Sequence, residues 1–344
     1  MNLLSRDNFR EGVFKRDKYT CVFPDCEKPA EDAHHIIERR LWLPPQEGGY
    51  YLNNGASVCE YHHQYGAETC LVCPQTLRLW CNLDTIIPKQ FRPEEAYDKW
   101  GTVMKKPTRS HIKYPSTQYL PNSPSCDGTL PNWNSFLHLP VIATIKMDGG
   151  NVCLTRQGVV ARNGESANHS SFSLLKERAV VYCSKIPEGI QIFGEWLFAR
   201  HSIAYENELA LENYLQIFSV WDQNKELFLG WDQVEKWAEI LEVPTVPVIG
   251  KYIFKSSIEA ENTITTIAED VIDQGHEGIV LRLVYPFHYG LFEGYVTENK
   301  KSTKATTSTG NSKSSWHVVA IGKYVRYGHV QTDHTWGRIK NVEK

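Results

Sequence analysis

The stretch TIKMDGGN, residues 144–151, decides how the larger part of the chain is interpreted. Lys146 ends an apolar, β-branched run that starts at Val141, and an acidic residue and two glycines follow shortly after it. Such a run is typical of a buried strand, and the glycines predict a tight turn behind it. Taken alone, the stretch also fits an ordinary hairpin whose first strand ends in a charge. Whether Lys146 has a structural or a chemical role therefore depends on the other motifs of the chain.

The composition indicates a globular protein. The 344 residues are 41% hydrophobic and 22% charged, and the length is enough for two or three domains. No apolar run reaches the roughly 18 residues of a membrane-spanning helix, and the polar N-terminus lacks a secretory signal, so we expect a cytoplasmic protein without a membrane partner. Residues 299–344 carry nine basic and two acidic side chains. This basic segment predicts either phosphate contacts or a solvated face.

The hydrophobic pattern predicts an α+β protein. We expect helices at 1–20, 170–182, 231–241 and 258–274, with helical stretches within 75–100. We expect strands at 140–146, 151–156, 190–196, 215–221, 278–284 and 316–326. Because these elements do not alternate as regular βαβ units, an antiparallel-rich sheet is favoured.

Composition shifts divide the chain into domains. Residues 1–104 hold most of the cysteines and are expected to form a small zinc domain with trailing helices. Residues 105–137 are rich in Pro, Ser and Asn, which predicts a linker. Residues 138–344 are expected to form the second domain, with a mobile loop at 298–315, where apolar residues are scarce.

The cysteine spacing predicts a metal site. Six of the nine cysteines lie between residues 21 and 81, and clustered cysteines in a reducing compartment indicate metal binding. Two pairs with short internal spacing, separated by a few dozen residues, match a tetrahedral structural zinc site, and their members are Cys21, Cys26, Cys59 and His62. Three further cysteines follow closely and are either ligands of a second metal or buried thiols: Cys70, Cys73 and Cys81.

The segments CVFPDC, DAHHII and NNGASVCEYHHQ together resemble the HNH nuclease family, a ββα-metal fold, over residues 10–75. The resemblance implies a divalent cation, expected to be Mg²⁺, with His34 and His63 as ligands. It also implies His35 as the general base and Asn54 as the residue that orients this base. The first cysteine pair is wider than the family's usual spacing, and His34 stands where an aspartate is common. The alternative is a structural zinc module that binds nucleic acid or only folds.

Five segments in the second domain have a recognisable order: ARNG at 161–164, FGEWLFARHS at 193–202, IFSVWD at 217–222, HEGIVLR at 276–282 and AIGKYVR at 320–326. Together with the Lys146 stretch they resemble the covalent nucleotidyltransferase superfamily of ligases and mRNA-capping enzymes, over residues 138–330. The resemblance implies that Lys146 attacks the α-phosphorus of ATP and forms a lysyl–AMP intermediate. The chemical role of Lys146 is thereby favoured.

The resemblance also implies roles for the other motif residues. It assigns site shaping to Asp148, phosphate or nucleic-acid contact to Arg162, ribose binding to Glu195, adenine stacking to Phe218, metal binding to Glu277 and α-phosphate contact to Lys323, with Arg326 as a second basic residue. His201 is either a substrate contact or a structural histidine. The family's last motif usually has two lysines separated by one residue. Here Lys323 and Arg326 are three apart and would face opposite sides of a strand, which favours Lys323.

The length of the tail bears on the substrate. Only 18 residues follow Arg326, too few for the five-stranded oligonucleotide-binding barrel of DNA ligases and capping enzymes. We therefore expect an ATP-dependent RNA ligase that joins a 3′-hydroxyl to a 5′-phosphate, as in RNA repair. The expected cofactors are ATP, Mg²⁺ or Mn²⁺, and Zn²⁺, and the expected partner is nucleic acid, preferably RNA, with a duplex nick or a broken end. The alternatives are a DNA ligase-like enzyme and a nucleic-acid-binding protein with degenerate sites.

Overall fold

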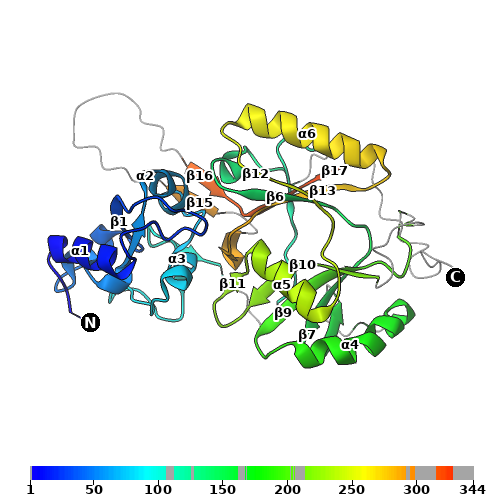
Figure 1. The fold of residues 1–344 in the computed structure, drawn as a ribbon, viewed down its shortest axis with the longest axis horizontal. Coiled ribbons are helices and arrows are strands. Elements are labelled where there is room, and N and C mark those ends of the chain that lie inside the picture. Colours follow the sequence, from blue (N-terminus) through cyan, green and yellow to red (C-terminus); the bar gives the residue numbers. More distant parts are fainter. Residues whose placement is uncertain are drawn as a thin grey trace. The chain divides into compact units, whose positions relative to one another are not determined.

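The computed structural model describes residues 2–105, 112–124, 128–161, 167, 169–201, 203, 205, 214–291, 295–298 and 315–327. The chain forms two compact units (Figure 1). Unit 1 comprises Met1–Lys106 and Glu293–Ala320, and unit 2 comprises Pro107–Phe292 and Ile321–Lys344. None of the helices in the described ranges has the length and apolar character needed to cross a membrane.

Unit 1 is built around a short two-stranded sheet. Strand β1 (Asp32–His35) pairs antiparallel with β2 (Gly55–Val58), and α2 (Glu60–His62) follows directly and continues as a π-helical turn, His63–Ala67. Helix α1 (Arg6–Arg16) begins after Ser5, whose hydroxyl accepts a hydrogen bond from the Asn8 amide, and it buries one side made by Phe9, Val13 and Phe14. The remaining elements of unit 1 are α3 (Pro74–Cys81), β3 (Ala96–Tyr97), β4 (Val103–Met104), β15 (Tyr295–Glu298) and β16 (Ser315–Val318).

Of the helical stretches predicted within 75–100, the structure contains one helix, α3, which ends at Cys81. Helix α3 ends where Asn82 adopts a left-handed conformation, with φ at 51°. Residues 82–100 contain the short strand β3 and no further helix.

Unit 2 contains two sheets whose described strands are antiparallel, except for the parallel pair β17–β5. The larger sheet has the order β14 (Phe287–His288), β11 (Leu227–Phe228), β10 (Leu215–Asp222), β9 (Ile190–Trp196), β7 (Gly150–Thr155) and β8 (Gly158–Ala161). The smaller sheet has the order β12 (Val248–Tyr252), β6 (Val141–Ile145), β13 (Gly278–Leu283), β17 (Ile321–Val325) and β5 (Gln118–Tyr119). The α+β class with antiparallel sheets agrees with the sequence-based prediction.

Three helices pack on these sheets. Helices α4 (Ser173–Lys185) and α5 (Trp231–Leu241) lie by the larger sheet, and α6 (Ser257–Asp273) runs along the smaller one (Figure 1). One core joins these elements: Ile142 of β6 packs in the same cluster as Ile192 of β9, Leu175 of α4 and Val234 of α5. Burial of these apolar side chains packs β6 of the smaller sheet against the larger sheet.

The segment predicted as a linker contributes to unit 2 in its described residues from 112 onward. Its strand β5 pairs with β17, and Leu120, Leu130 and Phe136 are buried. Pro and Ser are frequent here, but the apolar residues between them supply the core contacts. The predicted strand 316–326 is two strands, β16 and β17, which belong to different units. Most of the predicted mobile loop, residues 299–314, lies outside the described residues.

Candidate functional site

Lys146 and Glu277 are brought together by the pairing of β6 with β13. Ile145 lies opposite Ile279, and the Lys146 amide donates a hydrogen bond to the Gly278 carbonyl at 2.9 Å. The Lys146 ammonium pairs with the carboxylate of Glu277. The Glu277 side chain is 6% exposed and that of Lys146 is 25% exposed, so the pair is largely withdrawn from water but within reach of a ligand.

The glycines after Lys146 allow two strands to approach closely. A Cβ atom on Gly149 would lie 2.6 Å from the Trp196 carbonyl oxygen and 2.8 Å from a methyl carbon of Leu197. The Gly149 amide donates a hydrogen bond to the Glu195 carboxylate at 3.0 Å. The lack of a side chain at Gly149 therefore leaves room for the backbone that follows Glu195.

Asp148 ties a distant segment to the site. Its backbone amide donates a hydrogen bond to the Tyr205 hydroxyl at 2.7 Å, and its carboxylate accepts one from the Ile203 amide at 3.0 Å. Asp148 and Tyr205 are buried. This arrangement fits the shaping role expected for Asp148. Tyr205 and Ile203 were not predicted, because no local motif marks a residue whose partner is 57 positions away.

The electrostatics around Lys146 come from three carboxyl groups. Burial raises the pKa of Glu195 to about 7; the positive charge of Lys146 opposes this shift, and Glu277 and Asp148 reinforce it. Burial lowers the pKa of His201, and Asp148 counteracts this effect. Burial also raises the pKa of Tyr205. Glu195 therefore changes protonation near neutral pH, within the influence of Lys146.

Lys323 lies on the same face of the smaller sheet as the Lys146 end of β6. It is opposite Val280, which is opposite Thr144, and paired residues of antiparallel strands share a face. Lys146 is two positions beyond Thr144, and residues two apart in an extended chain lie on the same face. The Lys323 ammonium lies 4.1 Å from the ring centre of Tyr119.

Arg326 follows the end of β17. Its backbone amide donates a hydrogen bond to the Glu277 carbonyl at 3.1 Å, so its main chain is next to the Lys146 ion pair. Arg162 lies outside the described residues.

Phe218 occupies a β-bulge of β10, between the pairs that Ile217 and Ser219 make with β9. A bulge leaves a residue without its ladder partner. The buried Arg282 donates to the Phe218 carbonyl at 3.0 Å and to the Leu229 carbonyl at 2.9 Å. Arg282 therefore fixes the backbone at Phe218 from the opposite sheet, a role that the sequence did not indicate.

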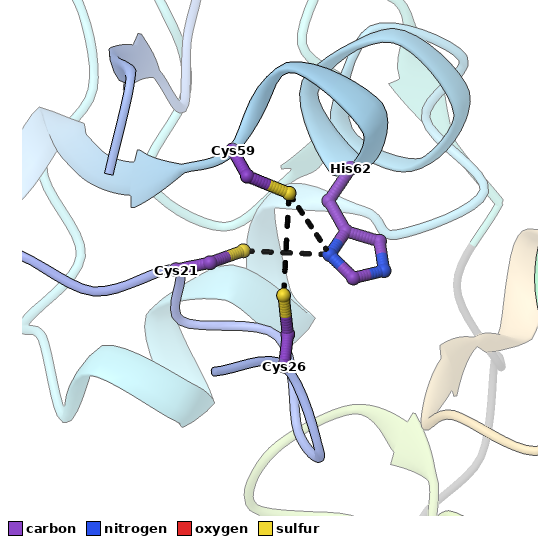
Figure 2. Close-up of side chains that lie close together, drawn as sticks. All are labelled: Cys21, Cys26, Cys59 and His62. Atoms are coloured by element: carbon purple, nitrogen blue, oxygen red, sulfur yellow. Dashed lines mark hydrogen bonds between the residues drawn. The ribbon is translucent and has the colours of Figure 1, made fainter. Parts of the chain in front are cut away.

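The four predicted zinc ligands of unit 1 converge (Figure 2). The sulfur atoms of Cys21 and Cys59 lie 3.4 Å and 3.5 Å from the Nδ1 atom of His62, and the sulfurs of Cys26 and Cys59 are 4.0 Å apart. A tetrahedral zinc with ordinary bond lengths would have S–N edges of about 3.6 Å and S–S edges of about 3.8 Å. Burial lowers the pKa of His62 to about 4, which leaves its imidazole neutral, as a ligand must be. The donor set and its spacing fit zinc.

A second group of potential ligands contains His34, His63 and Glu68. The Glu68 carboxylate lies 3.1 Å from Nε2 of His63 and 3.7 Å from Nδ1 of His34, and it pairs with the Lys99 ammonium. No motif in the sequence indicated a role for Glu68 or Lys99. The two metal-compatible groups found among the described residues do not include Cys70, Cys73 or Cys81; Cys70 and Cys73 are buried.

His35 belongs to a different face of β1 from His34, because neighbouring residues of a strand alternate. Its ring stacks on Phe9 with centres 4.6 Å apart. Burial and the charges of Lys99 and Arg39 lower the pKa of His35 to about 4. The His35 imidazole is therefore neutral at physiological pH, as a general base requires.

Asn54 is fully buried and binds backbone groups. Its side-chain oxygen accepts from the Ile37 amide at 2.9 Å, and its nitrogen donates to the carbonyls of Ile37 and Gly49 at 3.0 Å. These bonds fix the loop that follows His35.

The comparisons with known proteins concern part of the chain. Residues 139–306 match the family model for RNA ligase. Among solved structures, an archaeal ATP-dependent RNA ligase has 16% identity and a TM-score of 0.37, the match covering 50% of this chain and 46% of that one. A mutant of the Naegleria gruberi RNA ligase, with ATP and Mn, has 17% identity and a TM-score of 0.39, covering 54% and 57%. The chain thus spans about half the length of these structures. No curated protein matches the sequence.

Proposed function

We propose that this chain, whose residues 139–306 match the family model for RNA ligase, is an ATP-dependent RNA ligase that joins a 3′-hydroxyl to a 5′-phosphate. The observation that carries the proposal is the pairing of Lys146 with Glu277, with Glu195 held on the Gly149 amide beside them. A lysine at the end of a buried strand, surrounded by carboxyl groups, is placed to react with a nucleotide and to be reprotonated afterwards.

In the first step the neutral Lys146 amine attacks the α-phosphorus of ATP. The N–P bond forms, the bond between the α-phosphorus and the bridging oxygen breaks, and pyrophosphate leaves. The ammonium paired with Glu277 has no free electron pair, so it must first release a proton. Glu195, whose pKa lies near 7, is a suitable proton acceptor within the influence of Lys146.

In the next two steps the AMP group is transferred to the 5′-phosphate of the nucleic acid and is then released. An oxygen of the 5′-phosphate attacks the phosphorus of the lysyl–AMP, the N–P bond breaks, and the lysine amine is restored. The 3′-hydroxyl then attacks the capped 5′-phosphate, a phosphodiester forms, AMP leaves, and the hydroxyl proton is lost. Lys323, on the Lys146 face of the sheet, would stabilise negative charge on the α-phosphate.

The remaining motif residues would bind the nucleotide. Phe218, fixed at its bulge by Arg282, would stack on adenine, and Glu195 would also hold the ribose hydroxyls. Glu277 would hold Mg²⁺ or Mn²⁺, which supplies positive charge beside the phosphates. Arg162, Arg326 and His201 remain candidates for phosphate or nucleic-acid contact.

A sealing assay tests this function. End-labelled duplexes containing one nick, made of RNA or of DNA, are incubated with the full chain, ATP and Mg²⁺ or Mn²⁺. We expect ATP-dependent sealing, faster on RNA, that Lys146→Ala abolishes. Lys185→Ala is the control, because Lys185 pairs with Glu242 on an exposed part of the same unit. Faster sealing of the DNA nick would favour the DNA ligase alternative, and sealing by the Lys146 variant would contradict the proposal.

We further propose that unit 1 is an HNH-like zinc module that cleaves or grips nucleic acid. The converging Cys/His ligands and the neutral, half-buried His35 support it. Metal-dependent nicking of RNA or DNA that His35→Ala removes, with ATP omitted, would assign cleavage. Nucleic-acid binding without nicking by the unmodified chain would assign gripping. If the unmodified chain neither nicks nor binds nucleic acid when ATP is omitted, both roles of unit 1 are contradicted.

A further inference from the structure

We propose that Glu68 completes a divalent-metal centre with His34 and His63, and that Lys99 is a built-in competitor that holds Glu68 until the metal displaces it. The proposal concerns cation binding by unit 1. It deepens the divalent-metal site that the HNH resemblance implied for His34 and His63, but it does not depend on nucleic-acid cleavage or on the ligase reaction.

The π-helical turn brings Glu68 into the site. The Glu68 amide donates to the His63 carbonyl at 2.9 Å, five residues back, which is the hydrogen bond of a π-helix. This spacing places residues five apart on one face, whereas an ordinary α-helix would place residues three or four apart there. The Glu68 carboxylate consequently lies 3.1 Å from Nε2 of His63.

The environment of His34 indicates that His34, His63 and Glu68 bind a cation. It is 2% exposed, and neither ring nitrogen has a hydrogen-bond partner. A buried imidazole without partners is costly, because its polar atoms have lost water and gained nothing in return. Its Nδ1 atom is 3.7 Å from Glu68, and its ring centre is 5.1 Å from that of His63. A cation between the three side chains would satisfy it.

The Lys99 ammonium pairs with the Glu68 carboxylate, which is the group proposed to bind the metal. Its side chain is 4% exposed, and its ammonium is paired with Glu68. A divalent cation bound to Glu68 would lie close to this ammonium, and like charges in a poorly hydrated site repel strongly. The Trp100 ring, 4.8 Å from the ammonium, offers an alternative contact for the lysine after displacement. Lys99 therefore satisfies Glu68 in the absence of metal and lowers the affinity for it.

The ligand types predict which metal binds. Two imidazoles and one carboxylate suit Mn²⁺, Fe²⁺, Co²⁺, Ni²⁺ or Zn²⁺, whereas Mg²⁺ prefers oxygen ligands and retains its water. This preference differs from the Mg²⁺ that the resemblance implied for this site.

Binding of Mn²⁺ to the full chain carrying a single equivalent of zinc, followed by electron paramagnetic resonance without ATP, tests the proposal. We expect a site whose affinity falls at least about tenfold in Glu68→Gln and in His34→Ala, and rises about tenfold in Lys99→Met. Lys99→Gln, which keeps a polar side chain, should show the same tightening if Lys99→Met folds poorly. The control is Glu60→Gln, an exposed acid of α2 outside the group. Zinc content and circular dichroism establish that each variant is folded.

Two results would overturn the proposal. If Glu68→Gln leaves the Mn²⁺ affinity unchanged, Glu68 is not a ligand of the centre. If both folded Lys99 variants leave the Mn²⁺ affinity unchanged, Lys99 does not compete with the metal. Displacement of Mn²⁺ by an equal concentration of Mg²⁺ would contradict the metal preference. Because ATP is omitted and sealing is not measured, a failure of the ligase function would leave these outcomes unchanged.

Discussion

The Lys146 ammonium meets the Glu277 carboxylate although 131 positions separate the two residues in the sequence. The antiparallel pairing of β6 with β13 creates this contact, and the Gly278 carbonyl fixes the Lys146 backbone beside it. The pair contains both the proposed nucleophile and the proposed metal ligand. A change to either residue should therefore affect the reaction more than the fold.

Glu277→Gln should slow adenylation of Lys146 about a hundredfold or more, because it removes the charge proposed to hold the divalent cation. The rate of AMP transfer from ATP to the protein, measured at saturating Mg²⁺, checks this. The matched control is Glu242→Gln, which breaks the Lys185–Glu242 pair, whose carboxylate side chain is 81% exposed. Equal rates in the two variants would show that Glu277 has no part in the chemistry.

Gly149→Ala should impair folding and adenylation together. The new methyl group would meet the Trp196 carbonyl oxygen at 2.6 Å, and we expect the free energy of unfolding to fall by about 1–3 kcal/mol. Gly150→Ala is the control, because its methyl group would lie 3.4 Å from Phe172, an ordinary contact. Urea unfolding followed by fluorescence measures the difference. If the two variants are equally stable, the close approach at Gly149 is not a constraint.

Glu195→Gln should change how stability depends on pH. Burial raises the pKa of Glu195 from the ordinary 4.5 to about 7, so the folded protein holds a proton there that the unfolded chain releases. The carboxyl group therefore destabilises the fold increasingly as pH rises from 4.5 to 7, and the effect is complete above 7. The glutamine, which stays neutral, should gain up to about 3 kcal/mol relative to the parent over this range.

Urea unfolding of parent and variant at several pH values tests that difference. The exposed Glu188→Gln serves as the control and should show no such trend. A stability difference between parent and Glu195→Gln that is constant from pH 4.5 to 7 would show that Glu195 titrates normally.

Cys59→Ser should remove the structural zinc and unfold unit 1, because metal binding and folding are coupled at such sites. Elemental analysis should find zinc in the parent chain and close to none in the variant. Cys81→Ser, which leaves the four converging ligands intact, should retain the metal. Equal zinc content in both variants would contradict the assignment of the cluster.

Elements with a strong local pattern were predictable from the sequence. Helix α5 spans Trp231–Leu241 and strand β9 spans Ile190–Trp196, both as expected, because regular apolar spacing and short apolar runs are local signals. The meeting of Lys146 with Glu277 also follows an expectation, since ordered motifs at strand ends placed them in one site.

Other features depend on contacts that no local pattern encodes. Tyr205 reaches the Asp148 amide from a segment without a motif, and Arg282 supports Phe218 only because β10 has a bulge that the sequence does not announce. Glu68 was not predicted as a site residue, because a π-helical turn, rather than the usual helical spacing, brings it to His63.

The proposed ligase reaction depends on covalent attachment of AMP to Lys146. Its most direct test is intact-mass analysis of the full chain after incubation with ATP and Mg²⁺, followed by peptide mapping. We predict a mass gain of one AMP, located on Lys146, that is lost in Lys146→Ala and reversed by added pyrophosphate. An unmodified chain under these conditions, or an AMP group attached to another residue, would contradict the account.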